Sequence, residues 1–225
     1  MIIRLESTTS TMTDAAELAA RGAAHGTVVV ARQQTGGIGR QGHTWHSAPD
    51  GGLYLSMILR LPGSGPALTL ALGLAIQDAV TELAGITPDL RWPNDAMVSG
   101  RKLAGILVQA SGGALIAGIG LNVNQTSFPG DLASVATSLR LETGSEFSLD
   151  SGLELVRRTA LQYAELETPE VLRLFESRSS YARGKMVEVE GRFRGVTAGL
   201  DPTGFLLVRT ATGLETVLAG GVREL

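Results

Sequence analysis

The chain has 225 residues, of which 44% are hydrophobic, and its formal net charge is −3 with an isoelectric point of about 5.7. This length allows one large domain, or one domain with a small appendage, and the acidic balance gives no electrostatic reason to expect nucleic-acid binding. The absence of cysteine excludes disulfides, thiolate metal sites and a cysteine nucleophile. The three histidines, at positions 25, 43 and 46, lack metal-ligand spacing, so no metal site is expected.

Targeting and membrane signals are also missing from the sequence. The N-terminal ten residues lack the apolar core of a signal peptide. The longest apolar stretch, Ala67 to Ala75, is too short and too interrupted to span a bilayer. The sequence therefore predicts a cytoplasmic protein that has no membrane segment.

The chain begins with a predicted strand, Ile2 to Leu5, and a predicted helix, Asp14 to Ala24. Ser10 or Thr11 is expected to be the N-cap of this helix, with Thr11 and Asp14 at capping-box spacing. Five consecutive hydroxyl residues precede the helix, which is more than a cap requires. Some of them are therefore predicted to face a site at the helix N-terminus, where anions and polar groups are favoured.

A glycine-rich loop follows the next predicted strand, Thr27 to Ala31. Four glycines lie between Gly36 and Gly42, so the loop can present backbone N–H groups to a phosphate, to which Arg40 would add charge. The segment also matches the G-x-G-x-x-G fingerprint of dinucleotide-binding folds, which must open a helix. Because Pro49 follows without apolar periodicity, the sequence does not predict that fold.

Two apolar segments in the middle of the chain are predicted to form the core. Leu53 to Leu61 has the pattern of a strand with one apolar face, and Pro66 to Leu83 has that of a helix with apolar residues in steps of four. The other elements expected before residue 183 are a strand, a loop and two polar-faced helices: Ala114 to Gly120, Gln125 to Leu139, Ser151 to Leu166 and Glu170 to Ser180.

The most informative stretch is Arg91 to Leu107, where polar and charged residues interrupt an otherwise apolar chain. Pro93 ends the preceding strand, and Asn94 and Asp95 then lie at a strand end, where polar groups can face a cleft. After a predicted turn, Lys102 opens the returning strand, and a lysine fixed on a strand is a well-placed cation for a carboxylate or phosphate. The alternative is an ordinary hairpin with polar turn residues.

The character of the sequence changes after Arg183. Four short strand patterns follow one another closely, separated by turns such as Asp201-Pro202-Thr203-Gly204. Short strands that follow one another at such close spacing are typical of a small β-barrel. We therefore expect two domains, at residues 1–183 and 184–225.

Several of these segments together resemble the biotin protein ligases. Gln34 to Trp45 is similar to the biotin-binding loop of that family, usually written GRGRxGRxW. Trp92-Pro93-Asn94-Asp95 and Lys102 to Leu107 resemble its WPND and KLAGIL segments at their usual separation. Ser10-Thr11 is similar to its biotin-site Ser-Thr pair, and Gly118 to Asn124 to its G-x-G-x-N strand end. The small C-terminal barrel is also a feature of the family.

The resemblance implies an α+β fold: a central mixed β-sheet flanked by helices, like that of class II aminoacyl-tRNA synthetases and biotin–lipoate ligases, with a small C-terminal SH3-like β-barrel. It also implies a ligase reaction with ATP and Mg²⁺. The carboxylate of biotin attacks the α-phosphate of ATP, giving biotinyl-5′-AMP and pyrophosphate. A lysine of a biotin carboxyl carrier protein domain, from a biotin-dependent carboxylase such as acetyl-CoA carboxylase, then takes the biotinyl group.

The resemblance also assigns site residues. Lys102 and Arg40 are implied as the catalytic cations, because two anions must be screened from each other. The residues implied for biotin binding are Ser10, Thr11, Gln34, Gly37, Gly39, Arg40, Lys102, Gly105 and Gly118. Those implied for binding ATP and the adenylate are Arg40, Trp45, Arg91, Asn94, Asp95, Lys102 and Asn122. Three roles stay open for Asp95: orienting Lys102, holding magnesium, or helping to deprotonate the incoming lysine.

Two positions depart from the family's loop, because Ile38 and His43 stand where it carries arginines. Weaker retention of ATP or the adenylate is the expected consequence of Ile38. No DNA-binding domain precedes the Ser-Thr pair, so a ligase without repressor activity and without a nucleic-acid partner is expected; members of the family often form homodimers through the sheet. The alternatives are a lipoate or octanoyl transferase of similar fold, and a non-catalytic biotin-binding module.

Overall fold

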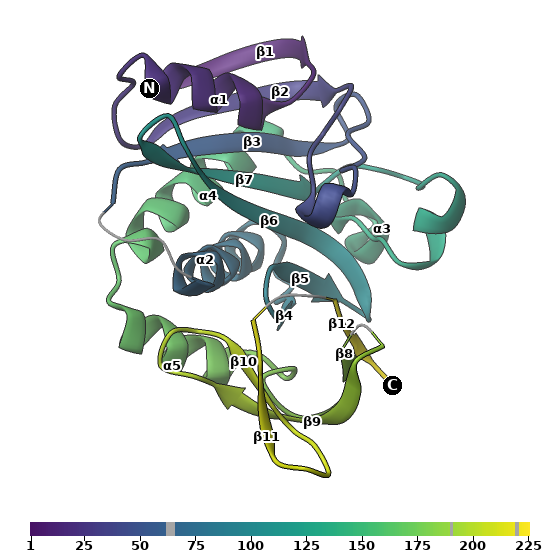
Figure 1. The fold of residues 1–225 in the computed structure, drawn as a ribbon. Helices are drawn as coiled ribbons and strands as arrows, with labels where there is room; N and C mark the ends of the chain where they lie inside the picture. The colour runs from purple at the N-terminus through teal and green to yellow at the C-terminus, as the bar shows by residue number, and fades with distance from the viewer. Residues whose placement is uncertain (62–65, 190, 219–220) are drawn as a thin grey trace.

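Two β-sheets organise residues 1–61, 66–189, 191–218 and 221–225, the part of the chain that the computed structural model describes (Figure 1). The large sheet consists of β1 (Ile2–Thr8), β2 (Thr27–Gln34), β3 (Gly52–Leu59), β4 (Asp89–Arg91), β5 (Asp95–Val98), β6 (Arg101–Ser111) and β7 (Ala114–Asn122). The small sheet consists of β8 (Arg183–Val189), β9 (Phe193–Leu200), β10 (Leu206–Arg209), β11 (Leu214–Val217) and β12 (Val222–Glu224). The helices are α1 (Thr11–Ala20), α2 (Pro66–Ala84), α3 (Leu139–Thr143), α4 (Leu149–Ala164) and α5 (Thr168–Arg178), with short 3₁₀ helices η1 (Arg40–Gly42) and η2 (Gly130–Ser134).

The large sheet is mixed, as predicted. Its strand order is β1-β2-β3-β7-β6-β5-β4, in which β1 and β2 pair in parallel and the other neighbours pair antiparallel. A parallel pair needs a crossover connection, and α1 provides it. The order also places β3, β7 and β6 at the centre of the sheet, where the predicted site segments lie.

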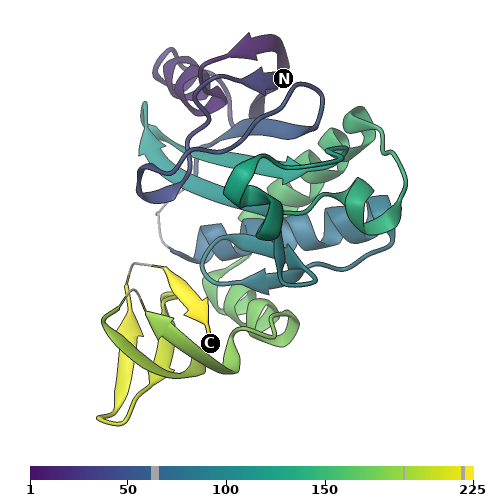
Figure 2. The same ribbon diagram turned by 90° about the vertical axis from the view of Figure 1, so that its right-hand side faces the viewer.

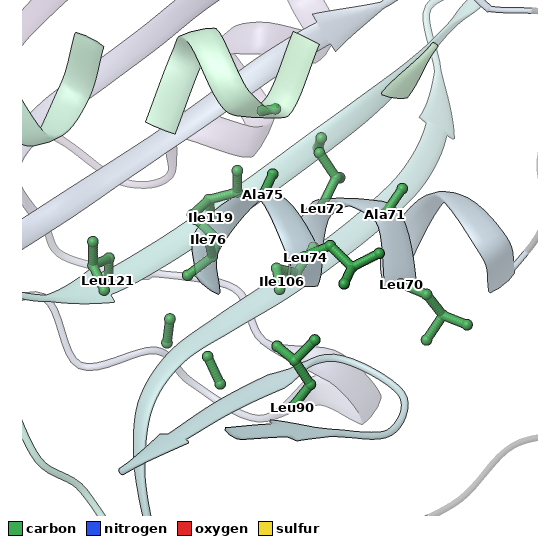
Figure 3. Close-up of a cluster of buried hydrophobic side chains, with 14 of the residues drawn as sticks. Leu70, Ala71, Leu72, Leu74, Ala75, Ile76, Leu90, Ile106, Ile119 and Leu121 are labelled. Carbon is green, nitrogen blue, oxygen red and sulfur yellow. The ribbon is translucent and has the colours of Figure 1, made fainter. Parts of the chain in front are cut away.

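Helices cover both faces of the large sheet (Figure 2). On one face, α1 packs Met12, Ala15 and Ala19 against residues of β2, β3 and β7. On the other face, α2 and α4 cover a larger core, and Figure 3 shows Leu74 and Ile76 of α2 among its side chains. The predicted apolar face of β3 belongs to this larger core.

The helix α2 is the one helix of the described residues that is long and apolar enough to cross a membrane, with a mean hydropathy of 1.4. This length exceeds the apolar stretch that the sequence alone indicated. However, 61% of the apolar window is buried inside the fold, against the sheet and α4. We therefore interpret α2 as a core helix.

The small antiparallel sheet has the order β11-β10-β9-β8-β12 and agrees with the predicted C-terminal barrel. Its first strand begins at Arg183, the position of the predicted domain boundary, and β12 is an additional strand that the sequence pattern did not indicate. The Trp92 indole Nε1 donates to the carbonyl oxygen of Gly204 at 3.0 Å and ties this sheet to the large one. Within the predicted loop from Gln125 to Leu139, η2 forms and α3 begins.

Candidate active site

Three adjoining cavities lie on the α1 side of the large sheet and share Lys102 and Trp45. The Gly118 cavity, of about 50 Å³, lies between α1 and the central strands. The Phe128 cavity, of about 230 Å³, is walled by the segment after β7. The Val222 cavity, of about 190 Å³, lies between the glycine loop, the β4–β5 turn and β12. Lys102 and Trp45 therefore stand where the three cavities meet.

The polar wall of the Gly118 cavity is a hydrogen-bonded set around Thr11. Its backbone N–H and its hydroxyl both approach the Gln34 side-chain oxygen, at 2.9 and 3.1 Å, and the hydroxyl also bonds the Ser56 hydroxyl at 2.8 Å. The Gln34 amide donates to Ser47 at 2.9 Å. Two predicted biotin residues, Thr11 and Gln34, are thus brought together and oriented by Ser56 and Ser47, which the sequence analysis did not identify.

The predicted cap of α1 is only partly correct. Ser10 is the N-cap residue by backbone conformation, but its hydroxyl makes no capping bond. The capping box between Thr11 and Asp14 is wrong, because Thr11 turns towards Gln34 and Asp14 accepts a hydrogen bond from Thr8 instead. The Ser10 hydroxyl is buried and has no hydrogen-bond partner within the described residues, but Ser10 lines none of the three cavities, so its role in biotin binding stays a prediction.

Glycines form the floor of the site because bulky side chains lie directly on their backbone. A Cβ atom on Gly105 would lie 2.9 Å from Trp45 Cζ3, and one on Gly120 would lie 2.2 Å from Trp45 Cε2. A Cβ on Gly118 would lie 2.5 Å from Met12 Sδ. The sequence analysis assigned Gly105 and Gly118 but missed Gly120 and Met12. Alternation along a strand, which puts Gly118 and Gly120 on one face, is the signal that identifies Gly120.

A β-bulge aims Lys102 into the site. The pairing of β5 with β6 shifts after Ala96, so that Met97 faces Lys102 and Leu103 is an extra residue on β6. In a regular strand Lys102 and Gly105 would point to opposite faces, whereas the bulge puts them on the same face. Accordingly, a Cβ atom on Gly105 would lie only 2.9 Å from Lys102 Cε.

The ammonium of Lys102 belongs to a small charge cluster. Its Nζ lies 2.6 Å from Asp95 Oδ1, and Arg91 Nη2 donates to Asp95 Oδ2 at 2.8 Å. The Asp95 side chain is only 13% exposed, so solvent screens both pairs weakly. The same ammonium lies 5.4 Å from the centre of a Trp45 ring. Both carboxylate oxygens of Asp95 face cations, which favours orienting Lys102 among the roles left open.

The glycine loop is held over these cavities by short contacts. It folds back on itself, with a hydrogen bond from Gly39 N–H to the His43 carbonyl at 2.7 Å. Arg40 Nη1 donates to the Asn94 side-chain oxygen at 3.1 Å, and the Asn94 amide donates to the Ile106 carbonyl at 3.1 Å. Only the three-residue η1 follows the glycines, in agreement with the rejection of a dinucleotide-binding fold.

Of the other predicted residues, Gly37 packs close to the Trp45 carbonyl, and Ile38 lines the Gly118 cavity with 42% of its surface exposed. His43 lines the Val222 cavity. Asn122 lines the Phe128 cavity, but it is buried and its amide already donates to the Thr137 carbonyl at 2.9 Å. Asn122 therefore shapes the wall of the cavity through its hydrogen bonds.

The neighbours of Asn122 continue this hydrogen-bonded wall. Gln125 donates to the Asn122 side-chain oxygen at 3.1 Å and lies 3.3 Å from the Tyr54 hydroxyl. Burial raises the pKa of Tyr54, and its hydroxyl donates to the Ala48 carbonyl at 2.9 Å.

No group of three or more metal-ligating side chains occurs among the described residues. The carboxylate beside Lys102 is that of Asp95, and its two oxygens are already paired with Lys102 and Arg91. Any magnesium ion in this site would therefore take most of its ligands from a bound nucleotide and from water, as Mg²⁺ commonly does.

Comparison with known proteins shows that this chain is similar to ligases. Residues 4–125 match the sequence model of the Biotin/lipoate A/B protein ligase family. The bifunctional ligase/repressor BirA of Bacillus subtilis is 34% identical over 229 residues, covering 95% of this chain and 70% of that protein. The biotin–[acetyl-CoA-carboxylase] ligase of Paracoccus denitrificans is 30% identical, with 97% and 98% covered. The biotin protein ligase of Aquifex aeolicus, solved with biotin and ATP, superposes with a TM-score of 0.90 at 32% identity, covering 100% and 99%.

Proposed function

Because this chain belongs to the Biotin/lipoate A/B protein ligase family, we propose that it is an ATP-dependent biotin protein ligase. The observation that carries the proposal is the meeting of three cavities at Lys102, with Arg40 lining two of them. Such an arrangement suits a reaction that joins a carboxylate to a nucleotide. The similarity to a ligase solved with biotin and ATP extends over the whole chain and supplies the two substrates.

We assign biotin to the Gly118 cavity, the adenine to the Phe128 cavity beside Trp45, and the phosphates to the Val222 cavity. A carboxylate oxygen of biotin attacks the α-phosphorus of ATP, the bond to the bridging oxygen breaks, and pyrophosphate leaves. Both reactants are anions, so the protein must reduce their repulsion and stabilise charge that develops at phosphorus. Lys102 and Arg40 supply that charge, and magnesium enters with the nucleotide.

In the second step, the amine of a carrier lysine attacks the acyl carbon of biotinyl-5′-AMP, the bond from that carbon to the phosphate oxygen breaks, AMP leaves, and the proton of the amine passes to solvent. Asp95 is placed near this carbon by the assignment above, but its oxygens pair with Lys102 and Arg91. We therefore assign to Asp95 the positioning of Lys102. The acceptor that we propose is the carrier domain of a biotin-dependent carboxylase, in keeping with the names of the relatives.

Biotin is preferred over lipoate or an octanoyl group for a specific reason. The family description covers lipoate as well as biotin, but the relatives that match nearly the whole chain are biotin ligases or ligase/repressors. A non-catalytic biotin-binding module is disfavoured because a paired lysine lies beside the cavity. A homodimer, the absence of nucleic-acid binding and a cytoplasmic location stay predictions of the sequence.

We expect the purified protein to attach one biotinyl group to a single lysine of a carboxylase carrier domain when biotin, ATP and magnesium are supplied. Intact-mass measurement of the carrier checks this, and a carrier whose acceptor lysine is replaced by arginine is the control. A carrier that stays unmodified, or that accepts lipoate equally well, would contradict the proposal.

A further inference from the structure

The segment 135–137 runs beside Lys102 and is bound to its backbone. Lys102 N–H donates to the Val135 carbonyl at 2.8 Å, and Thr137 N–H donates to the Lys102 carbonyl at 2.9 Å. Lys102 and Ala136 thereby form a parallel bridge. Because Val135 and Ala136 also line the Phe128 cavity, the position of the lysine and the shape of that cavity depend on the same backbone.

One carboxylate fastens this segment to the strand that carries Lys102. Glu142, at the end of α3, accepts hydrogen bonds from the Thr137 hydroxyl and, at 2.7 Å, from Arg101 Nη2. The Ser99 hydroxyl, in the β5–β6 turn, approaches its second oxygen at 3.4 Å. Glu142 thus joins the β5–β6 turn and the residue directly before Lys102 to the segment beside it.

The burial of Glu142 indicates that these contacts matter energetically. An exposed ion pair contributes little, because solvent screens it and its side chains must be ordered. The Glu142 side chain is only 11% exposed, and three donors converge on its oxygens. Glu142 lines none of the three cavities of the site, so it does not contact the substrates assigned to them.

We propose that Glu142 is a positioning residue for the nucleotide half of the site. It holds segment 135–137 against β6, and so sets both the wall of the Phe128 cavity and the backbone of Lys102, without touching a substrate. The proposal rests on the assignment of the nucleotide to that cavity. The hydrogen-bonding wall of the biotin half, formed by Thr11 of α1 and Gln34 of β2, has no contact with this link.

Glu142→Gln keeps the size of the side chain but removes the negative charge that pairs with Arg101. We expect the dissociation constant for ATP and the KM for ATP to rise about tenfold, the size of losing one charged hydrogen bond. The dissociation constant for biotin should stay within about twofold, because no contact of Glu142 reaches the Gly118 cavity. Titration calorimetry with ATP and with biotin, and steady-state exchange kinetics, measure these quantities.

Arg101→Gln removes the other partner of the Glu142–Arg101 ion pair and serves as the second variant. It should weaken ATP binding similarly, and the double variant should be no worse than either single one, because coupled residues act non-additively. Glu82→Gln is the matched control, since Glu82 pairs with Arg158 away from the site. It should leave both dissociation constants unchanged.

Two results would overturn the proposal: ATP binding unchanged in both link variants, or ATP and biotin binding weakened equally, as general destabilisation would produce. If the proposed function itself were wrong, the unmodified protein would show no biotin-dependent ATP–pyrophosphate exchange, which is a different result from either of these two. Direct ATP titration still tests the role of Glu142 in that case.

Discussion

Replacing Lys102 with alanine should lower the rate of biotin-dependent ATP–pyrophosphate exchange roughly 10²–10³-fold, the usual cost of losing one preorganised charge at a reacting centre. The reason is geometric. The bulge at Leu103 and the ion pair with Asp95 fix the ammonium where the three cavities meet. Biotin binding should be largely retained, because the hydrogen-bonding groups around Thr11 and Gln34 do not involve Lys102. Exchange kinetics and biotin titration on the same preparation measure both effects.

The sequence offers a matched control, because Lys185 is its only other lysine. Lys185 lies on β8, pairs with Glu224 at 2.7 Å, and lines none of the three cavities. Lys185→Ala should leave exchange unchanged. If Lys102→Ala exchanged at a rate close to that of the unmodified protein, Lys102 would have only a structural role.

Replacing Arg40 with glycine should let the reactive adenylate escape. Arg40 is the cation of the glycine loop, and its contact with Asn94 holds the loop beside β6. Loss of a charged hydrogen bond costs about 1.5–3 kcal/mol, which corresponds to about ten- to hundredfold faster release of biotinyl-5′-AMP. The variant should still form adenylate from biotin and ATP. Labelling of an added lysine-rich bystander protein measures the escape, because this chain itself offers only two lysines.

Ile38→Arg is the opposing variant, since it restores charge to the loop next to the Gly118 cavity, where Ile38 is half exposed. Bystander labelling should fall in this variant and rise in Arg40→Gly. Proteolysis of the loop should be suppressed by biotin plus ATP in the unmodified protein but not in Arg40→Gly. Equal protease resistance with and without ligands would mean that Arg40 is a fixed part of the site and that the loop does not close over it.

The strands and helices that carry the site were predictable because their patterns are strong. The predicted apolar face of β3 and the four-residue steps of α2 both lie in the larger core as expected, although the opposite face of β3 is also buried, with Ile58 packed under α1. The pairing of Arg91 with Asp95 also follows from the sequence in retrospect, because a tight turn at Pro93 places these residues opposite each other on β4 and β5.

Other features leave no pattern in the sequence. The bulge at Leu103 depends on pairing with another strand, so the orientation of Lys102 could not be derived from its position alone. The Thr11 hydroxyl could form a hydrogen bond within its own helix or with Gln34 on β2. The tertiary structure favours Gln34, and the sequence of the helix alone does not show this. The strand β12 has only three residues, too few to show a period, yet it brings Val222 to the site.

The most direct test of the central claim is ATP–pyrophosphate exchange with biotin, and with lipoate as the competing acid. The account predicts exchange that requires biotin and magnesium together and that is absent with lipoate. Equal exchange with lipoate, or no exchange with biotin, would contradict the assignment of this protein as a biotin protein ligase.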